Sequence, residues 1–109
     1  MGTITAEQFG ALPGVQDWHA GESGAIAEFR TGDFAAGARL FAAIAGLAEA
    51  ANHHPDVDVR YASVRVTLIT HSAGGLTNKD AALAAQISSA ARELGIAAEA
   101  PSPSSDPEV

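Results

Sequence analysis

Three of the four histidines in this chain fall within one stretch, residues 49–80. His53 and His54 are adjacent, and His71 follows a run rich in β-branched residues. Histidine carries protons in many active sites because its charge changes near neutral pH. Glu49 lies one helical turn before the pair, where its carboxylate could raise the basicity of a neighbouring imidazole. These residues indicate a site for proton transfer, a metal site or a set of structural histidines.

The metal reading is the weaker of the first two. Three histidines could bind zinc, but adjacent residues such as His53 and His54 usually diverge rather than chelate together. The sequence also has no H-x-H or H-x-x-x-H spacing and no cysteine. Without cysteine there are no disulfides, thiolate ligands or cysteine nucleophiles. We therefore expect no metal.

A structural explanation also exists for each residue. Imidazolium is favoured at the C-terminal end of a helix dipole, so the sequence from His53 to Pro55 can be a polar helix end. His71 can be a surface histidine at the end of a strand, and Glu49 a solvated helix residue. Asp80 could have no role other than that of the acidic residue in a helix capping box, or it could have this role and a role in the site as well. The residues alone leave these alternatives open.

Apolar spacing predicts the elements that position these residues. Apolar positions three and four apart predict a long amphipathic helix over 34–51, with Asp33 as its N-cap. Asn52 suits its C-terminal end, and Pro55 forbids continuation. The other expected segments are a helix over 5–12, a strand over 25–30, a loop over 71–76, and a helix from Thr77 to Gly95. Between them, residues 57–61 and 64–70 form two short strands or one sharply bent strand, with a turn or bulge at Ala62-Ser63.

This order predicts an α+β fold, a two-layer sandwich with an antiparallel sheet of about four strands and helices packed on one face. In such a layout the histidine pair at a helix end and His71 at a strand end can meet on one rim. We expect one domain over residues 1–96. Residues 97–109, rich in proline, serine and acidic side chains, are expected to form a disordered tail.

Composition excludes several functions. The 109 residues carry a formal charge of −7, with 13 acidic against 6 basic side chains. Such a surface repels phosphate backbones and anionic lipids, so we expect neither nucleic acid nor a membrane as partner. No apolar run is expected to reach the roughly 18 residues of a membrane span, and no secretory signal is visible. We expect a cytoplasmic protein whose alanine-rich, thin core favours association between subunits.

The spacing of the site residues resembles the signature of the pterin-4a-carbinolamine dehydratases, and about three quarters of the chain takes part. The resemblance rests on Glu49, His53-His54-Pro55, Tyr61, Thr70-His71, Gly74-Gly75-Leu76-Thr77 and Asp80, with weaker matches at Trp18, Phe29 and Asp33-Phe34. It implies a small α+β protein that forms dimers or tetramers. It also implies removal of water from a 4a-hydroxytetrahydropterin, giving the quinonoid dihydropterin that aromatic amino acid hydroxylases reuse after reduction.

The resemblance assigns roles as well. His53 and His54 would transfer protons, and His71 would hold the pterin and could share that task. Asp80 would orient a histidine by accepting its other N–H, with Glu49 and Pro55 as further substrate-binding or orienting residues. Neither a metal nor another cofactor is required, because the pterin is the substrate.

The sequence also departs from the family where an aromatic residue often follows the histidine pair. Asp56-Val57-Asp58-Val59 stands there and implies a smaller or more acidic pocket wall. Tyr61 is more readily explained as a residue packed on the sheet than as a ligand contact. Trp18 either lines the pocket or closes the core.

A non-catalytic binding protein on the same fold is the alternative function. Relatives of the resembled family are known as partners of transcription factors and as assembly chaperones for an enzyme, and a fold does not determine a function. A scaffold has no need for three convergent imidazoles, so the complete histidine set favours the enzyme.

Overall fold

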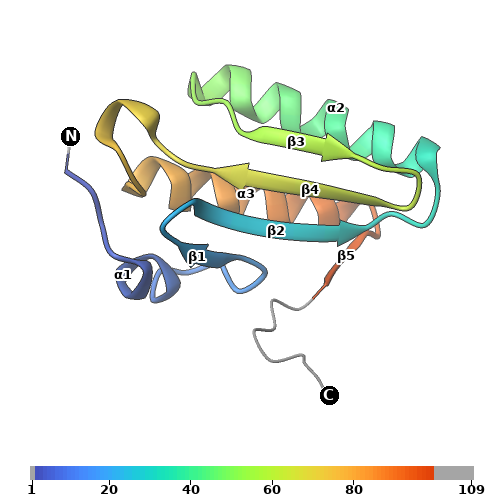
Figure 1. The fold of residues 1–109 in the computed structure, drawn as a ribbon. Coiled ribbons are helices and arrows are strands. Elements are labelled where there is room, and N and C mark those ends of the chain that lie inside the picture. Colours follow the sequence, from blue (N-terminus) through green and yellow to red (C-terminus); the bar gives the residue numbers. More distant parts are fainter. Residues whose placement is uncertain (1, 100–109) are drawn as a thin grey trace, which may run out of the picture.

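Two long helices cover one face of a five-stranded antiparallel sheet (Figure 1). The computed structural model describes residues 2–99. The strand order is β1-β2-β4-β3, and β5 pairs with β2 beside β1. The expected α+β sandwich is confirmed, with one strand more than the predicted four. The elements are α1 (Ala6–Gly10), β1 (His19–Gly21), β2 (Gly24–Arg30), α2 (Phe34–Ala51), β3 (Asp56–Val59), β4 (Ser63–Leu68), a 3₁₀ turn (His71–Ala73), α3 (Asn78–Glu93) and β5 (Ala97–Glu99).

Helix α2 has the bounds that its apolar spacing predicts. The Asp33 carboxylate accepts a hydrogen bond from the Ala36 backbone N–H at 2.8 Å, which satisfies a donor that a helix start leaves free. Leu40 and Ile44 point into the core and are almost fully buried. Asn52 ends the helix in the left-handed conformation with φ 51°, which asparagine tolerates better than most residues.

Strands β3 and β4 form a hairpin, which is one of the two arrangements that the change in apolar parity allowed. Val57 lies opposite Val66 and Val59 opposite Val64, so the apolar side chains of both strands face the helices. The turn occupies residues 60–62, and the Arg60 N–H donates to the Ser63 carbonyl at 2.8 Å. A single strand with one parity change would have turned one of these two sets to solvent.

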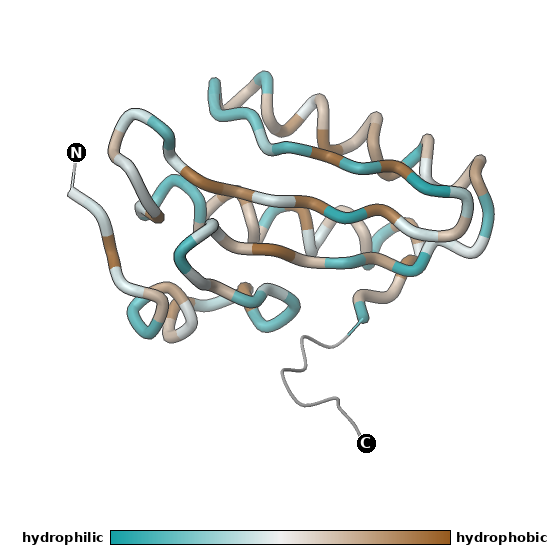
Figure 2. The backbone as a smooth tube through the Cα atoms, viewed as in Figure 1, coloured by the Kyte–Doolittle hydropathy of each residue, from teal (hydrophilic) through white to brown (hydrophobic). Residues whose placement is uncertain are grey.

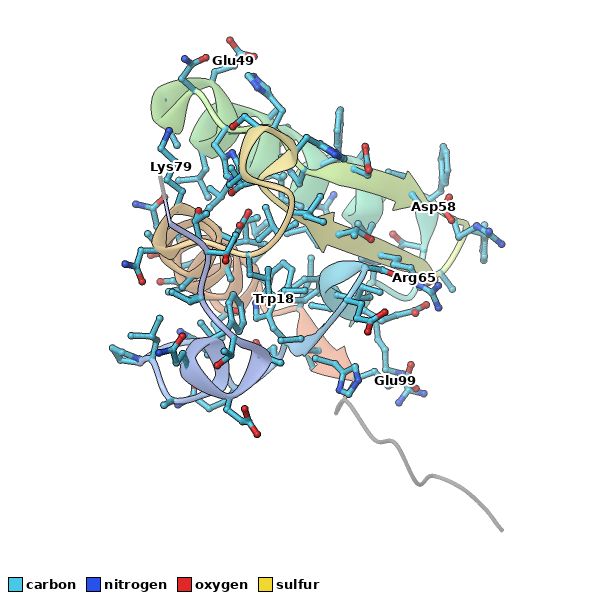
Figure 3. All side chains as sticks on the ribbon, turned by 60° about the vertical axis from the view of Figure 1, so that its left-hand side comes forward. Trp18, Glu49, Asp58, Arg65, Lys79 and Glu99 are labelled. Atoms are coloured by element: carbon cyan, nitrogen blue, oxygen red, sulfur yellow. The ribbon has the colours of Figure 1, made fainter. Side chains whose placement is uncertain are left out.

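The core also decides the position of Trp18. Its ring packs edge-on against Phe29, with centroids 6.2 Å apart, and only 6% of the residue is exposed. The indole Nε1–H donates to the buried Ser88 hydroxyl at 2.9 Å. Trp18 therefore closes the core between sheet and helices, where Figure 3 labels it, and does not line the histidine site.

Strand β5 corrects the expectation for the tail. Ala97–Glu99 pair with residues 28–30 of β2, so the domain continues to Glu99 at least. The buried Ile96, whose N–H donates to the Ala91 carbonyl at 2.8 Å, anchors this strand after α3 ends. The rest of the expected tail, residues 100–109, lies outside the described part of the chain.

Helix α2 corrects a second expectation. It is apolar along almost its whole length (Figure 2), and among residues 2–99 it is the one helix with the length and composition of a membrane span. The expectation that no such run exists is therefore wrong. One side of α2 packs into the core through five residues, so it is the core helix of this domain: Ala36, Gly37, Leu40, Ile44 and Ala48.

Candidate functional site

The end of α2 and the start of α3 lie at the same end of the molecule (Figure 1). The loop over 69–77 joins β4 to α3 there, and β3 starts there after the histidine pair. Figure 3 shows the labelled residues Glu49 and Lys79 at this end. The antiparallel path of the chain therefore brings residues 49–55 to residues 70–80.

A pair formed by a half-buried histidine and a fully buried carboxylate is the centre of this site. His53 Nε2 lies 2.6 Å from Asp80 Oδ1, with side-chain exposures of 12% and 0%. The His53 backbone N–H donates to the Ala48 carbonyl at 3.1 Å, which fixes its position just beyond α2. A hydrogen bond to a carboxylate in such a low-dielectric environment is shorter and stronger than the same bond in water.

Asp80 caps α3 and also contacts a histidine. Its Oδ2 accepts the Thr77 backbone N–H at 2.9 Å, as the acidic residue of the capping box that starts α3. The same oxygen accepts the Thr70 hydroxyl at 2.7 Å. Oδ1 remains for His53. Capping and contact with the histidine are therefore properties of one carboxylate, not alternatives.

His54 has a carboxylate partner as well, but in solvent. Its Nε2 lies 2.8 Å from Glu49 Oε2, and the side chains are 55% and 78% exposed. Exposed pairs of this kind contribute about 0–1 kcal/mol because water and salt screen them. The two adjacent histidines thus differ strongly in how firmly each ring is held.

Both rings use Nε2 for the carboxylate, which has a chemical consequence. When Nε2–H donates to a carboxylate, the neutral imidazole has its lone pair on Nδ1. This tautomer is assigned from the hydrogen-bond partners. Nδ1 of His53 and of His54 can then accept a proton, and the carboxylate stabilises the imidazolium that forms. The pair can act as general base and, once protonated, as general acid.

His71 is connected to the site by the preceding residue, Thr70, which bonds to Asp80. It is exposed and begins a 3₁₀ turn that ends at Gly74 with φ 76°, a conformation in which glycine lacks the usual penalty. Thr70, just before it, forms an isolated antiparallel β-bridge with Gly75, and its hydroxyl donates to Asp80. Across residues 2–99 no group of three His, Cys, Asp or Glu side chains is placed to hold a metal ion.

Several known proteins are similar to this chain in sequence or in fold. The family described as "Pterin 4 alpha carbinolamine dehydratase" matches residues 3–90. The chain belongs to this family. A protein of Chloroflexus aurantiacus, named as a candidate pterin-4-alpha-carbinolamine dehydratase, is 49% identical over 82 residues, which cover 75% of this chain and 85% of that protein. A similarly named protein of Nocardia farcinica is 43% identical over 82 residues, covering 75% and 86%.

A solved structure supports this membership in the pterin 4 alpha carbinolamine dehydratase family. The crystal structure of a "transcriptional coactivator/pterin dehydratase" from Brucella melitensis superposes with a TM-score of 0.72 at 30% identity. The match covers 82% of this chain and 97% of that one. The resemblance stated from the histidine spacing is confirmed.

The structure separates the predicted dehydratase residues into two groups. Five of them gather at the end of α2 or the start of α3: Glu49, His53, His54, Pro55 and Asp80. His71 lies in the adjoining loop. Tyr61 instead lies 72% exposed in the β3–β4 turn, at the opposite end of the hairpin from the histidine pair, and does not pack on the sheet as expected.

The sequence indicated Thr77 as a helix N-cap, but it gave no role for the Thr70 hydroxyl and no sign that the two hydroxyls are bonded to each other. Both side chains are buried and bonded to each other at 2.8 Å, and Thr70 is bonded to Asp80. The only signal was their position, since Thr70 precedes His71 and Thr77 is the N-cap of α3.

Proposed function

We propose that this protein is a hydro-lyase that dehydrates a 4a-hydroxytetrahydropterin to the quinonoid dihydropterin. Membership in the pterin 4 alpha carbinolamine dehydratase family gives the reaction class. The observation that carries the proposal for this chain is the His53–Asp80 pair, 2.6 Å apart and almost removed from solvent. A fully buried carboxylate bonded to a histidine at the rim is the usual way to fix a catalytic tautomer.

The reaction needs two proton movements and no electron acceptor. The C4a–O bond breaks with its electrons on oxygen, which takes up a proton and leaves as water. The N5–H proton is lost, and the electrons of that bond complete the C4a=N5 double bond. Groups that titrate near neutral pH can perform both steps. We assign the N5 proton to Nδ1 of His53 and delivery of the proton to the leaving oxygen to His54.

The remaining residues would position the substrate. We assign the pterin ring contact to His71 and orientation of His54 to Glu49, with Pro55 fixing the direction in which the chain leaves the pair. An aromatic amino acid hydroxylase remains the proposed source of the substrate. We also propose a cytoplasmic location.

The test is a stopped-flow assay of 4a-hydroxytetrahydropterin decay. We expect wild type to accelerate decay with or without a chelator, and His53→Ala and His54→Ala each to lose about 10²- to 10⁴-fold, the range of general acid–base catalysis. His19→Ala is the matched control, because His19 is exposed on β1 outside the site. Near-normal rates in both site variants would exclude the assignment.

We further propose that the protein associates with copies of itself through α2. Phe34 and Phe41 are 56% and 45% exposed, large values for aromatic side chains. With the exposed Ala38 and the half-buried Ala45 they form a stripe at spacings of four, three and four residues along one flank of α2, beside its buried face. Exposed apolar patches of this kind mark interaction surfaces. Light scattering should show a dimer or tetramer for wild type and a smaller species for Phe34→Ser/Phe41→Ser; a monomeric wild type would contradict this.

A binding function without catalysis is the second candidate. Its support is the Brucella melitensis protein, whose description combines a coactivator with a dehydratase. The α2 stripe would then contact a protein partner instead of a second copy. Folded wild type without dehydratase activity would favour this candidate, and the next measurement would be the effect of the Phe34→Ser/Phe41→Ser change on partner binding.

A further inference from the structure

A chain of buried hydroxyl groups continues behind the His53–Asp80 pair. Thr70 Oγ1 lies 2.7 Å from Asp80 Oδ2, and Thr77 Oγ1 lies 2.8 Å from Thr70 Oγ1. Thr70 is 6% exposed, and Thr77 and Asp80 are fully buried. The Lys79 backbone N–H ends the chain with a 3.2 Å bond to Thr77 Oγ1. Water does not compete for these bonds, so each contributes more than a surface bond would.

The donors and acceptors allow one direction for this chain. An ionised carboxylate only accepts, and each hydroxyl has one proton to donate. The Thr70 hydroxyl donates its one proton to Asp80, so in the bond between the threonines the Thr77 hydroxyl donates and Thr70 accepts. Thr77 can then accept from Lys79 with a lone pair. Every bond therefore runs toward Asp80, which receives His53 Nε2–H on the other oxygen.

We propose that Thr70 is a positioning residue, whose hydroxyl holds the Asp80 carboxylate in the orientation that keeps His53 protonated on Nε2. This inference rests on the proposed function, because it assigns a catalytic task to His53 Nδ1. Thr77 supports Thr70 by leaving it a single possible direction of donation. Asp80 Oδ2 is held by two donors, so the carboxylate cannot rotate about its Cβ–Cγ bond without breaking both.

The bond between Thr70 and Asp80 connects the loop that contains His71 to helix α3. Thr70 directly precedes His71, while Asp80 lies in α3 and holds His53 at the end of α2. The Thr70 hydroxyl thus fixes the base of the His71 loop to the element that orients His53. The His54–Glu49 pair has no comparable support among residues 2–99, since its two exposed side chains bond only to each other.

The closing experiment compares Thr70→Val with Thr70→Ser. Valine keeps the shape of threonine and removes the hydroxyl, whereas serine keeps the hydroxyl. We expect Thr70→Val to lower kcat about tenfold with KM within about twofold, and Thr70→Ser to restore kcat, because about tenfold is the lower end of the range for one hydrogen bond to a charged group. Thr67→Val, a half-buried threonine of the same strand segment, is the matched control with unchanged kcat.

A second readout does not depend on activity. Ring ¹⁵N NMR of wild type should show His53 protonated on Nε2, Thr70→Val should show a mixture of both tautomers, and Thr70→Ser the wild-type pattern. Thr70→Ala, with the same expected results, replaces Thr70→Val if the valine variant does not fold. An unchanged tautomer and kcat without the hydroxyl would overturn the inference, as would failure of Thr70→Ser to restore them. If wild type shows no dehydration, the proposed function fails and the tautomer still decides the role of Thr70.

Discussion

Asp80→Asn is the substitution that most directly tests the chemistry of the site. The amide has nearly the shape of the carboxylate but replaces one acceptor oxygen by a donor NH₂. Two donors, the Thr70 hydroxyl and the Thr77 N–H, converge on Oδ2, whereas only His53 meets Oδ1. The carbonyl oxygen will therefore occupy the Oδ2 position, and the NH₂ will face His53.

The expected loss of activity follows from this orientation. An NH₂ donor requires His53 Nε2 to accept, so the ring proton moves to Nδ1, the atom that should receive the substrate proton. The charge-assisted bond that stabilises the imidazolium is also lost, which is worth about 1.5–3 kcal/mol. At about 1.4 kcal/mol per factor of ten, kcat falls roughly 10- to 150-fold. Glu49→Gln should lose no more than about fivefold, because an exposed pair contributes at most about 1 kcal/mol.

Stability should change much less than activity. The asparagine side chain of the Asp80→Asn variant keeps the two bonds at the start of α3, and the neutral amide avoids the burial of a charge. We expect a loss of about 1 kcal/mol in the free energy of unfolding, or roughly 4–8 °C in Tm for a domain of this size. Asp80→Ala should be less stable than Asp80→Asn, because it also leaves the Thr70 hydroxyl and the Thr77 N–H without their acceptor.

Stopped-flow decay of the hydroxypterin and thermal unfolding of the same samples measure both quantities. Asp33→Asn is the matched control, since Asp33 also caps a helix but lies at the start of α2, away from the histidines. It should keep both rate and stability, because asparagine caps as well as aspartate. A wild-type rate for Asp80→Asn, or equal rate losses in the two variants, would refute the reasoning.

Three further predictions concern the fold around the site. Asn52→Ala should cost about 1 kcal/mol in urea unfolding and Asn52→Gly almost nothing, because φ is 51° there; equal stabilities would contradict this. Trp18→Phe should cost about 1–3 kcal/mol by leaving the buried Ser88 hydroxyl without its partner, and adding Ser88→Ala should recover part of the loss in a double-mutant cycle. The hydrogen bond from Arg60 holds the pKa of the exposed Asp58 below its ordinary value of 3.8. The ionised Asp58 therefore stabilises the fold above pH 3.8, and this contribution is lost as the pH falls through the lowered pKa. Urea unfolding should show that the free energy of unfolding of Asp58→Asn depends less on pH in this range, and that it equals the wild-type value below the lowered pKa.

The parts of the fold predicted from the sequence are those that local patterns determine. Asp33 and Asn52 mark the two ends of α2 by their capping chemistry, and the structure has those ends. The change of parity between Val59 and Val64 excluded a single flat strand, because side chains alternate along a strand, but it left open two short strands or one sharply bent strand.

The short strands could not be predicted in this way. β5 has the sequence Ala97-Ala98-Glu99, which has no apolar alternation of its own. It forms because Ile96 is buried after α3 and because β2 offers a free edge beyond β1. Such pairing depends on the assembled sheet and cannot be recognised in the sequence of the strand itself.

The candidate site shows the same division between local and assembled properties. Sequence spacing selected His53 and Asp80, but it also allowed Asp80 to be only a helix cap. Spacing does not show the direction of a side chain, so it could not distinguish the capping oxygen from the one that meets His53. The buried threonines were missed for the same reason, since only the folded loop turns the Thr70 hydroxyl toward Asp80.

The double use of Asp80 has a consequence for how the site and the fold depend on each other. The carboxylate that lies 2.6 Å from His53 Nε2 also caps the start of α3, so the geometry at His53 is held by a regular helix and not by a loop alone. A substitution that frays the first turn of α3 should therefore disturb the His53 tautomer, even though it touches no histidine. His54, whose partner Glu49 is exposed, has no such connection, and its ring can adjust to the substrate. If His53 is the base and His54 the acid, as proposed, a firmly held base beside a mobile acid would suit a reaction in which one proton leaves a fixed ring nitrogen and the other is delivered to a departing water.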